Sequence, residues 1–180
     1  KATFTIKTLD HNELTDFTGF QSLDIQWTLD NTKLLIMHNA QHDLMWLWEC
    51  GYKYDGDIYD TMLAEYILDR GQRNGLSLEA CAERRQLGAQ KDDTLKKYFK
   101  EGKNTNEIPL QELCHYLKHD LFTTCELFHA QERDFSLPEA SSLSTIKRVT
   151  FNTCKTLTEI YMAGFKVDLQ ELERVAKEFE

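Results

Sequence analysis

The fold is decided by ten consecutive residues, Leu34-Leu35-Ile36-Met37-His38-Asn39-Ala40-Gln41-His42-Asp43. Four apolar residues in a row, bounded by polar ones, are typical of a short buried strand. Asn39 favours the position just before a helix, so we expect a helix from there to about Cys50, ended by Gly51. Asp43 then lies in its first turns. The stretch predicts an α/β unit in which a strand delivers polar side chains to the start of a helix.

The same strand-to-helix pattern recurs further along the chain. Residues 57–60 predict a short strand, with Asp60 as the cap of the helix that follows. We expect further helices from Ser77 to near Gly88, from about Asp93 to Glu101, and from Pro109 to about Gln131. In residues 1–33 the pattern predicts only a strand at 3–7 and a helix near 12–22.

Beyond the break at Pro138, the sequence predicts a helix from about Ser142 to Met162, ended by Gly164. A last helix is expected from Asp168, whose Asp-x-x-Glu start is similar to a capping box. We place a domain boundary near residues 136–141, which divides the chain into an α/β domain at 1–138 and the start of a second domain at 139–180.

The helix that follows Pro109 carries Tyr116 and Asp120, which are four residues apart and therefore leave one face a turn apart. A carboxylate binds a hard cation, and a phenol one turn away can orient an attacking water. Together with Asp43 from the earlier helix, these groups suit metal-assisted hydrolysis of a phosphodiester. The alternatives are that Asp43 is an ordinary carboxylate favoured by the helix dipole, and that Tyr116 and Asp120 are a surface pair.

Composition sets wider bounds on the chain. Its 180 residues, 41% hydrophobic and 28% charged, suit one well-cored globular domain. No apolar run approaches the ~18 residues that span a bilayer, and no secretory signal is visible, so we expect no membrane association. Five cysteines without a C-x-x-C pair predict buried free thiols in a reducing cytosol, which would make the protein cytoplasmic. A net charge of −9 argues against extensive electrostatic binding of nucleic acid. It does not argue against binding of a short single strand beside bound cations, whose charge offsets that of the carboxylates.

Taken in order, these motifs resemble the 3′–5′ proofreading exonuclease domain of family A (polymerase I-like) DNA polymerases. That domain belongs to the DEDD superfamily, which has an RNase H-like fold. Residues 35–47 resemble the second motif of the family, and residues 115–120 resemble the third motif in its tyrosine variant. Asp60-Thr61-Met62 resembles a structural Asp-Thr-Met segment, and residues 159–168 resemble the junction with the polymerase portion. The resemblance implies a mixed sheet flanked by helices.

The first motif of the family, Asp-x-Glu, does not occur upstream of Asp43, and Asp24-Ile25-Gln26 is the nearest match. We interpret this as a chain that starts downstream of that motif, so that the fold lacks its first strand or strands. The alternative interpretation is a nuclease site that has degenerated.

The resemblance also implies a mechanism with two Mg²⁺ or Mn²⁺ ions. Asp120 would bind the ion that activates water, and Asp43 would hold the ion that stabilises the leaving 3′ oxygen, while Tyr116 orients the nucleophile. Asn39 would steady the strand–helix turn or touch the terminal nucleotide, and Leu44 and Phe122 would contact bases. The expected substrate is a single-stranded DNA 3′ end, and the expected products are nucleoside 5′-monophosphates.

Other functions remain open at this stage. They are an RNase D-like exoribonuclease, a catalytically inactive exonuclease-like scaffold domain of a DNA polymerase, and a helical interaction domain whose motif matches are accidental. By resemblance, the partner would be the polymerase portion of the same chain, and we expect a monomer whose isolated activity is weak or absent.

Two further clusters have an ordinary and a functional interpretation. His115 and His119 could bind zinc, joined by Cys114 and Cys125, but solvent-facing histidines are the preferred interpretation. Four lysines at 96, 97, 100 and 103 are interpreted as a solvated helix face, with phosphate contact as the alternative.

Overall fold

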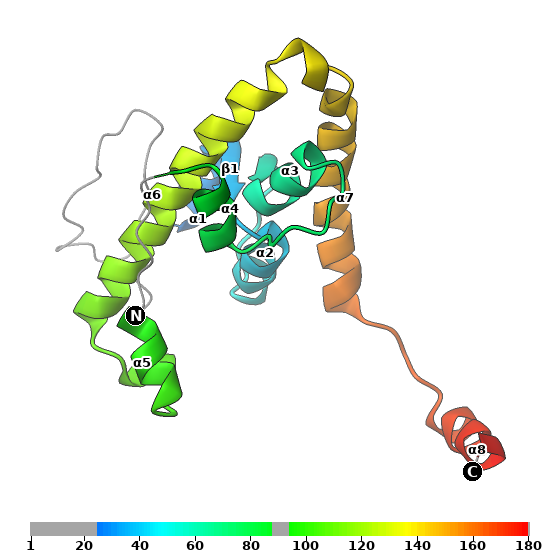
Figure 1. Cartoon of the computed structure of the whole chain (residues 1–180). Helices are drawn as coiled ribbons and strands as arrows, with labels where there is room; N and C mark the ends of the chain where they lie inside the picture. Colours follow the sequence, from blue (N-terminus) through cyan, green and yellow to red (C-terminus); the bar gives the residue numbers. More distant parts are fainter. Residues whose placement is uncertain (1–24, 88–93, 180) are drawn as a thin grey trace.

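The computed structural model describes residues 25–87 and 94–179, which form a mostly helical α/β structure (Figure 1). The expected strand at 3–7 and helix near 12–22 lie outside these residues. The elements are α1 Ile25–Asp30, β1 Leu34–Met37, α2 Ala40–Glu49, β2 Asp57–Asp60, α3 Thr61–Leu68, α4 Leu78–Arg84, α5 Thr94–Lys100, α6 Leu110–Phe135, α7 Leu143–Ala163 and α8 Leu169–Phe179, with 3-10 turns at Thr105–Glu107 and Pro138–Ala140.

The sheet of the described residues consists of β1 and β2, which pair in parallel from Leu34 opposite Asp57 to Met37 opposite Asp60. Both strands were predicted, and they are connected through α2. Because the strands are parallel, their carboxyl ends meet at one edge of the sheet. At that edge β1 leads into α2, and β2 leads directly into α3.

The ends of helices α2 and α4 are set by residues in the left-handed backbone conformation. The expected stop of α2 is confirmed, because Gly51 adopts φ 84° and its amide donates to the carbonyl of Trp48. Helix α4 was predicted to reach Gly88 but ends at Arg84. There Gln86 takes the left-handed conformation at φ 55°, and the Leu87 amide returns to the Ala82 carbonyl in a Schellman motif.

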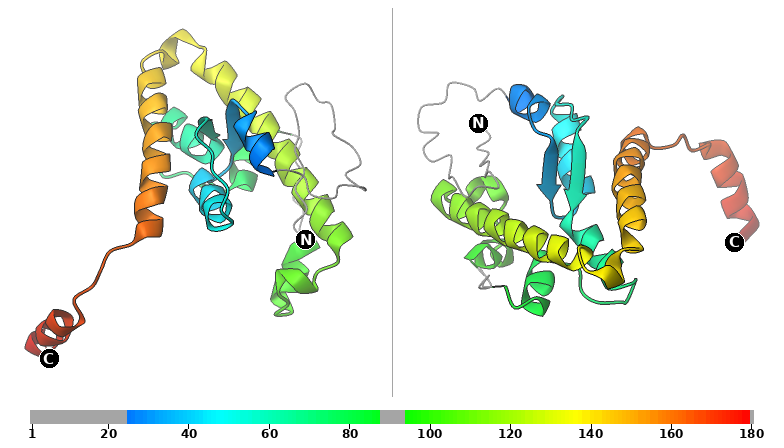
Figure 2. Two further views of the ribbon diagram at one scale, coloured as in Figure 1. Left: turned by 180° about the vertical axis from the view of Figure 1, so that it is seen from behind. Right: turned by 90° about the horizontal axis from the view of Figure 1, so that it is seen from above.

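The core joins the sheet to the two longest helices. Tyr59 of β2 packs edge to face against Phe128 of α6 and Phe151 of α7, with ring centroids 4.7 Å and 5.0 Å apart. Both helices leave the connection at residues 136–142 and diverge, so that they flank α2, α3 and the sheet on two sides (Figure 2). Helix α6 passes its predicted end because the side chains of Gln131 and Phe135 are both buried.

The two helices beyond the predicted boundary, α7 and α8, differ in how they pack against the rest of the fold. Helix α7 packs against α2, α3 and β2, and it places Phe151 and Cys154 in the same core as the strands. Helix α8 has no buried residue and follows a connection at 164–168 that leads away from α7 (Figure 1). The division at 138/139 stays a prediction, and any boundary has to accommodate the contacts of α7.

Two expectations drawn from composition can be compared with the structure. All five cysteines are free, although only Cys81 and Cys154 are buried. None of the helices within residues 25–87 and 94–179 combines the length and apolar character that a bilayer crossing needs.

Candidate functional site

The carboxyl edge of the sheet is organised by one buried side chain, that of Asp60, which is 1% exposed. Its Oδ1 accepts from the amides of Met62 at 2.9 Å and Leu63 at 3.3 Å, which confirms the predicted cap of α3. The same carboxylate also accepts from the amides of Asn39 at 3.1 Å and Ala40 at 2.8 Å. One residue therefore caps two helices and fixes the turn that leads from β1 into α2.

Asn39 occupies the predicted cap position of α2, but its side chain makes no capping hydrogen bond. The residue adopts φ 66° and ψ 58°, a left-handed conformation that asparagine tolerates better than most residues. Its side chain is exposed, and the capping role passes to Asp60. The turn thus leaves the side-chain amide of Asn39 at the surface, beside the first turn of α2.

Asp43 lies in that first turn, as predicted. The residue is exposed, yet protein atoms crowd its carboxyl group, and this loss of hydration raises its pKa from 3.8 to about 6. The neighbouring His42 opposes the shift, and the negative charge of Asp60 adds to it. A bound cation would relieve the same penalty, because it favours the charged form of the carboxylate.

A second side chain, His38, ties this turn to its surroundings. Its Nδ1 lies 2.8 Å from Oγ1 of Thr61, and its Nε2 lies 3.0 Å from the carbonyl oxygen of Leu76. The Thr61 Oγ1 also lies 3.1 Å from the carbonyl oxygen of Met37. Burial lowers the pKa of His38, against the opposing effects of Asp60, the Leu76 carbonyl and Glu65. The His38 ring therefore connects the ends of both strands with the segment before α4.

Helix α6 presents Tyr116 and Asp120 on the face that packs against the rest of the fold. At about 100° per residue, these two positions fall within roughly 60° of Thr123 and Leu127, which are 2% and 0% exposed. Tyr116 and Asp120 are themselves half-buried. Helix α6 packs against β1 and α3. The phenol and the carboxylate lie on the same side of α6 as its buried residues, but nearer the start of the helix than Thr123, where the tightly packed part begins.

The placement of α6 depends on a buried ionic network around Glu65 of α3, which is 1% exposed. Its carboxylate pairs with Arg84 at 2.8 Å and Arg85 at 2.7 Å, and it accepts from the Gln131 amide of α6 at 2.8 Å. Gln131 also donates to the Thr61 carbonyl at 2.9 Å. The helix that carries Tyr116 and Asp120 is thereby fixed to the same junction that Asp60 caps.

Two residues expected to contact bases are placed differently. Leu44 is 0% exposed and belongs to the hydrophobic core, so its side chain offers no surface to a base. Phe122 is 42% exposed, but it lies about 200° around α6 from Asp120, on the other side of the helix. The positions of Leu44 and Phe122 therefore do not suit contact with a base bound beside Asp120.

The predicted ligand sets can be compared with the described side chains. No group of three or more His, Cys, Asp or Glu within residues 25–87 and 94–179 could hold a metal ion, and this includes the set around His115 and His119. By the resemblance, Asp43 and Asp120 would be two of the four acidic ligands of a DEDD site. These residues alone do not form a complete two-metal site.

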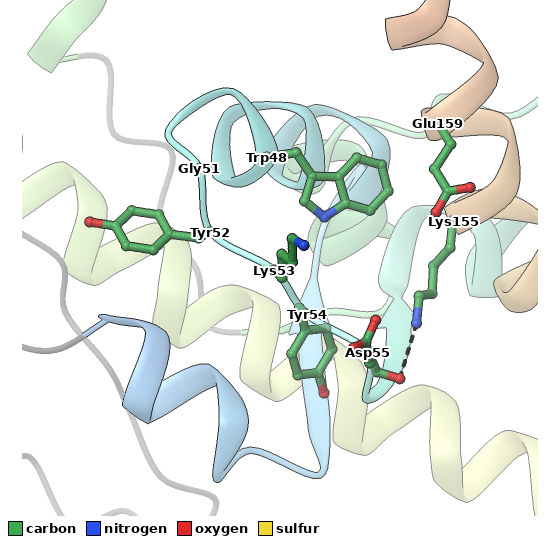
Figure 3. A pocket seen from close by; sticks show the side chains of 8 residues that line it. All are labelled: Trp48, Gly51, Tyr52, Lys53, Tyr54, Asp55, Lys155 and Glu159. Atoms are coloured by element: carbon green, nitrogen blue, oxygen red, sulfur yellow. Dashed lines mark hydrogen bonds between the residues drawn. The ribbon is translucent and has the colours of Figure 1, made fainter.

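A cleft of about 310 Å³ lies at the opposite edge of the sheet, beside the residues that precede β2 (Figure 3). Trp48 forms one wall, and Lys155 of α7 reaches across to donate to the carbonyls of Asp55 and Gly56 at 3.2 Å and 3.0 Å. Because the strands separate this cleft from the Asn39 turn, it is not part of the candidate site.

Sequence reasoning missed three of the side chains that build this edge: the double cap by Asp60, the bridge made by His38 and the buried charge of Glu65. The Asp-Thr-Met pattern indicated the first only as a helix cap. A charged residue on the apolar face of α3 was an available signal for Glu65.

Comparison with known proteins adds a separate finding. A family model described as 3′–5′ exonuclease matches residues 15–134, which is two thirds of the chain and includes every candidate site residue. Comparisons with curated proteins and with solved structures gave no significant match.

Proposed function

Because the chain belongs to the 3′–5′ exonuclease family of family A DNA polymerases, we propose that it is the proofreading part of such an enzyme. It would remove nucleotides from a single-stranded DNA 3′ end and release nucleoside 5′-monophosphates. In this proposal residues 1–138 form an RNase H-like exonuclease domain, residues 139–180 begin the polymerase portion, and the protein acts as a cytoplasmic monomer.

One arrangement carries the proposal: Tyr116 and Asp120 lie on the side of α6 that is buried further along the helix, and Asp60 fixes the turn into the helix that carries Asp43. Ligands of parallel α/β sheets commonly bind at this edge. The raised pKa of Asp43 also supports the proposal, because shifted carboxyl groups concentrate at functional sites.

The roles follow from the chemistry of each group. Asp43 and Asp120 would hold divalent cations, which supply Lewis-acid activation of water and stabilisation of the leaving oxygen. The Tyr116 phenol would hydrogen-bond the nucleophilic water and fix its direction of attack. Asn39, exposed at the turn into α2, would donate from its side-chain amide to the terminal nucleotide.

The test is digestion of a 5′-labelled single strand in Mg²⁺ or Mn²⁺, together with Mn²⁺ binding followed by electron paramagnetic resonance. We expect Asp120→Asn and Asp43→Asn to weaken Mn²⁺ binding and to abolish the weak cleavage of the unchanged chain. Asp55→Asn, at the other edge of the sheet, is the matched control and should change neither. If Asp120→Asn binds Mn²⁺ as tightly as the unchanged chain, the assigned site is wrong.

A second candidate is an inactive exonuclease-like scaffold domain of a polymerase. It is favoured by the lack of an Asp-x-Glu upstream of Asp43 and by the incomplete metal cluster of the described residues. A chain that binds single-stranded DNA but gives no cleavage in either metal would support this candidate. Cleavage of RNA in preference to DNA would instead support the RNase D-like alternative.

A further inference from the structure

Helix α5 and the three residues after it carry the densest run of positive charge in a chain whose net charge is −9. Four lysines at 96, 97, 100 and 103 alternate with Tyr98 and Phe99 over eight residues that contain one acidic side chain. Basic side chains interleaved with aromatic ones are typical of surfaces that bind single-stranded nucleic acid. A local patch of this kind can attract a polyanion even where the overall charge is negative.

The helix turns these lysines outward. At about 100° per residue, Lys96, Lys97 and Lys100 fall within an arc of roughly 100°, whereas Leu95 and Tyr98 project from the other side. Leu95 is 8% exposed, and Phe99, between the two sides, is 52% exposed. The packed side of α5 is therefore apolar and the exposed side is basic.

The attachment of α5 places this basic side beside the candidate site. The Tyr98 hydroxyl donates to Oε1 of Glu112 at 2.7 Å, and the Lys97 ammonium lies 3.3 Å from the other oxygen of that carboxylate. Glu112, Tyr116 and Asp120 are each four residues apart on α6, so they form one line along its inward face. Helix α5 is thus fixed at the head of the line that carries the phenol and the carboxylate (Figure 1).

The ion pairs of these lysines with protein carboxylates lie at exposed positions. Lys96 lies 3.6 Å from Glu79, and Lys103 lies 2.9 Å from Glu101. The side chains of Lys96, Lys97 and Lys103 are 48%, 55% and 42% exposed in these pairs. Ion pairs at such exposed positions contribute little, so phosphate groups can replace the carboxylates at small cost.

We propose that the basic side of α5 binds the phosphate backbone of a single strand whose 3′ end lies at Tyr116 and Asp120. Glu112 lies about 12 Å along the helix axis from Asp120, the length of three or four stacked nucleotides at about 3.4 Å each. The contact is therefore made three or four nucleotides from the terminus. This inference rests on the proposed function for the position of the 3′ end.

The experiment measures binding of fluorescent dT8 and dT2 to the full chain in EDTA, across a series of salt concentrations. We expect Lys97→Gln with Lys100→Gln to weaken dT8 binding on the order of tenfold at low salt, and to reduce the salt slope by about 1.4 for two lost contacts. Binding of dT2, which is too short to reach α5, should not change. Lys97→Arg with Lys100→Arg should retain the affinity for dT8, which excludes a loss through misfolding.

The matched control is Lys166→Gln with Lys177→Gln, two exposed lysines near and within α8 that alter the net charge equally. The proposal is overturned if this control weakens dT8 binding as much as the α5 variant does. It is also overturned if the α5 variant keeps its affinity and salt slope, or if the unchanged chain does not bind dT8. If the unchanged chain binds dT8 through α5 while Asp120→Asn leaves Mn²⁺ binding unchanged, the proposed nuclease site is refuted and the phosphate contact of α5 stands.

Discussion

Replacement of Asp60 by alanine should remove the common anchor of α2 and α3. The Asp60 carboxylate accepts from four backbone amides, and it is 1% exposed, so water cannot easily take its place. Loss of one helix cap costs about 0.5–2 kcal/mol, and a hydrogen bond to a charged group contributes about 1.5–3 kcal/mol. Because two caps are lost and buried amides are left without acceptors, we expect the free energy of unfolding to fall by about 4 kcal/mol.

Asp60→Asn should cost less, about 2 kcal/mol, since the remaining carbonyl oxygen can keep the bonds to Asn39, Met62 and Leu63 while the bond to Ala40 is lost. Urea denaturation gives both values, and hydrogen exchange of the Ala40 and Met62 amides reports on the two caps separately. Asp57→Ala at the exposed start of β2 is the control, with an expected change within about 0.5 kcal/mol. If Asp60→Ala costs no more than this control, the carboxylate does not organise the sheet edge.

Three other perturbations test the same region. Asp43→Asn should stabilise the fold at pH 8, because the folded-state pKa of Asp43, about 6, lies above the ordinary value of 3.8 and the carboxyl group destabilises the fold as pH rises between them. In urea denaturation this advantage should vanish at pH 3.5. His38→Phe should lower the free energy of unfolding by about 1–3 kcal/mol through the lost bonds to Thr61 and Leu76. Since the folded-state pKa of His38 is lowered, wild-type melting temperatures should fall as pH drops through about 6.5, and the variant should show a smaller fall. Glu65→Ala should cost about 3 kcal/mol, because Arg84 and Arg85 lose the buried carboxylate that they share. The cost stays at the low end because Asp69 and Asp134 still pair with these arginines, and Glu65→Gln should cost less, as measured by thermal denaturation.

The elements that the sequence predicted well are those determined by neighbouring residues. Strand β1 follows from four apolar residues, and the end of α2 follows from Gly51, whose left-handed conformation closes the helix. The end of α4 was predicted wrongly because Gln86 takes that conformation two residues before Gly88. The extent of α6 depends on burial of Gln131 and Phe135 by distant segments, which local patterns do not contain.

In the candidate site, too, the sequence predicted what depends on neighbouring residues and missed what depends on distant ones. Spacing alone placed Tyr116 and Asp120 on one face of a helix, and the structure adds that this face is the inward one. The bonds from Asp60 to Asn39 and Ala40 span about twenty positions, so no local pattern reveals them. The position of Phe122 could have been predicted, because residues two apart on a helix cannot share a face.

Because the Asp60 carboxylate caps two helices, residue 60 cannot change during evolution without affecting the starts of both α2 and α3. A serine or threonine could satisfy one set of amides but is too short and has too few acceptor oxygens to satisfy both. We therefore expect variation among relatives to be far narrower here than at Ser77, a cap that serves α4 alone. A change at this position would demand simultaneous replacements in both turns, which makes the junction a poor target for gradual remodelling of the neighbouring surface.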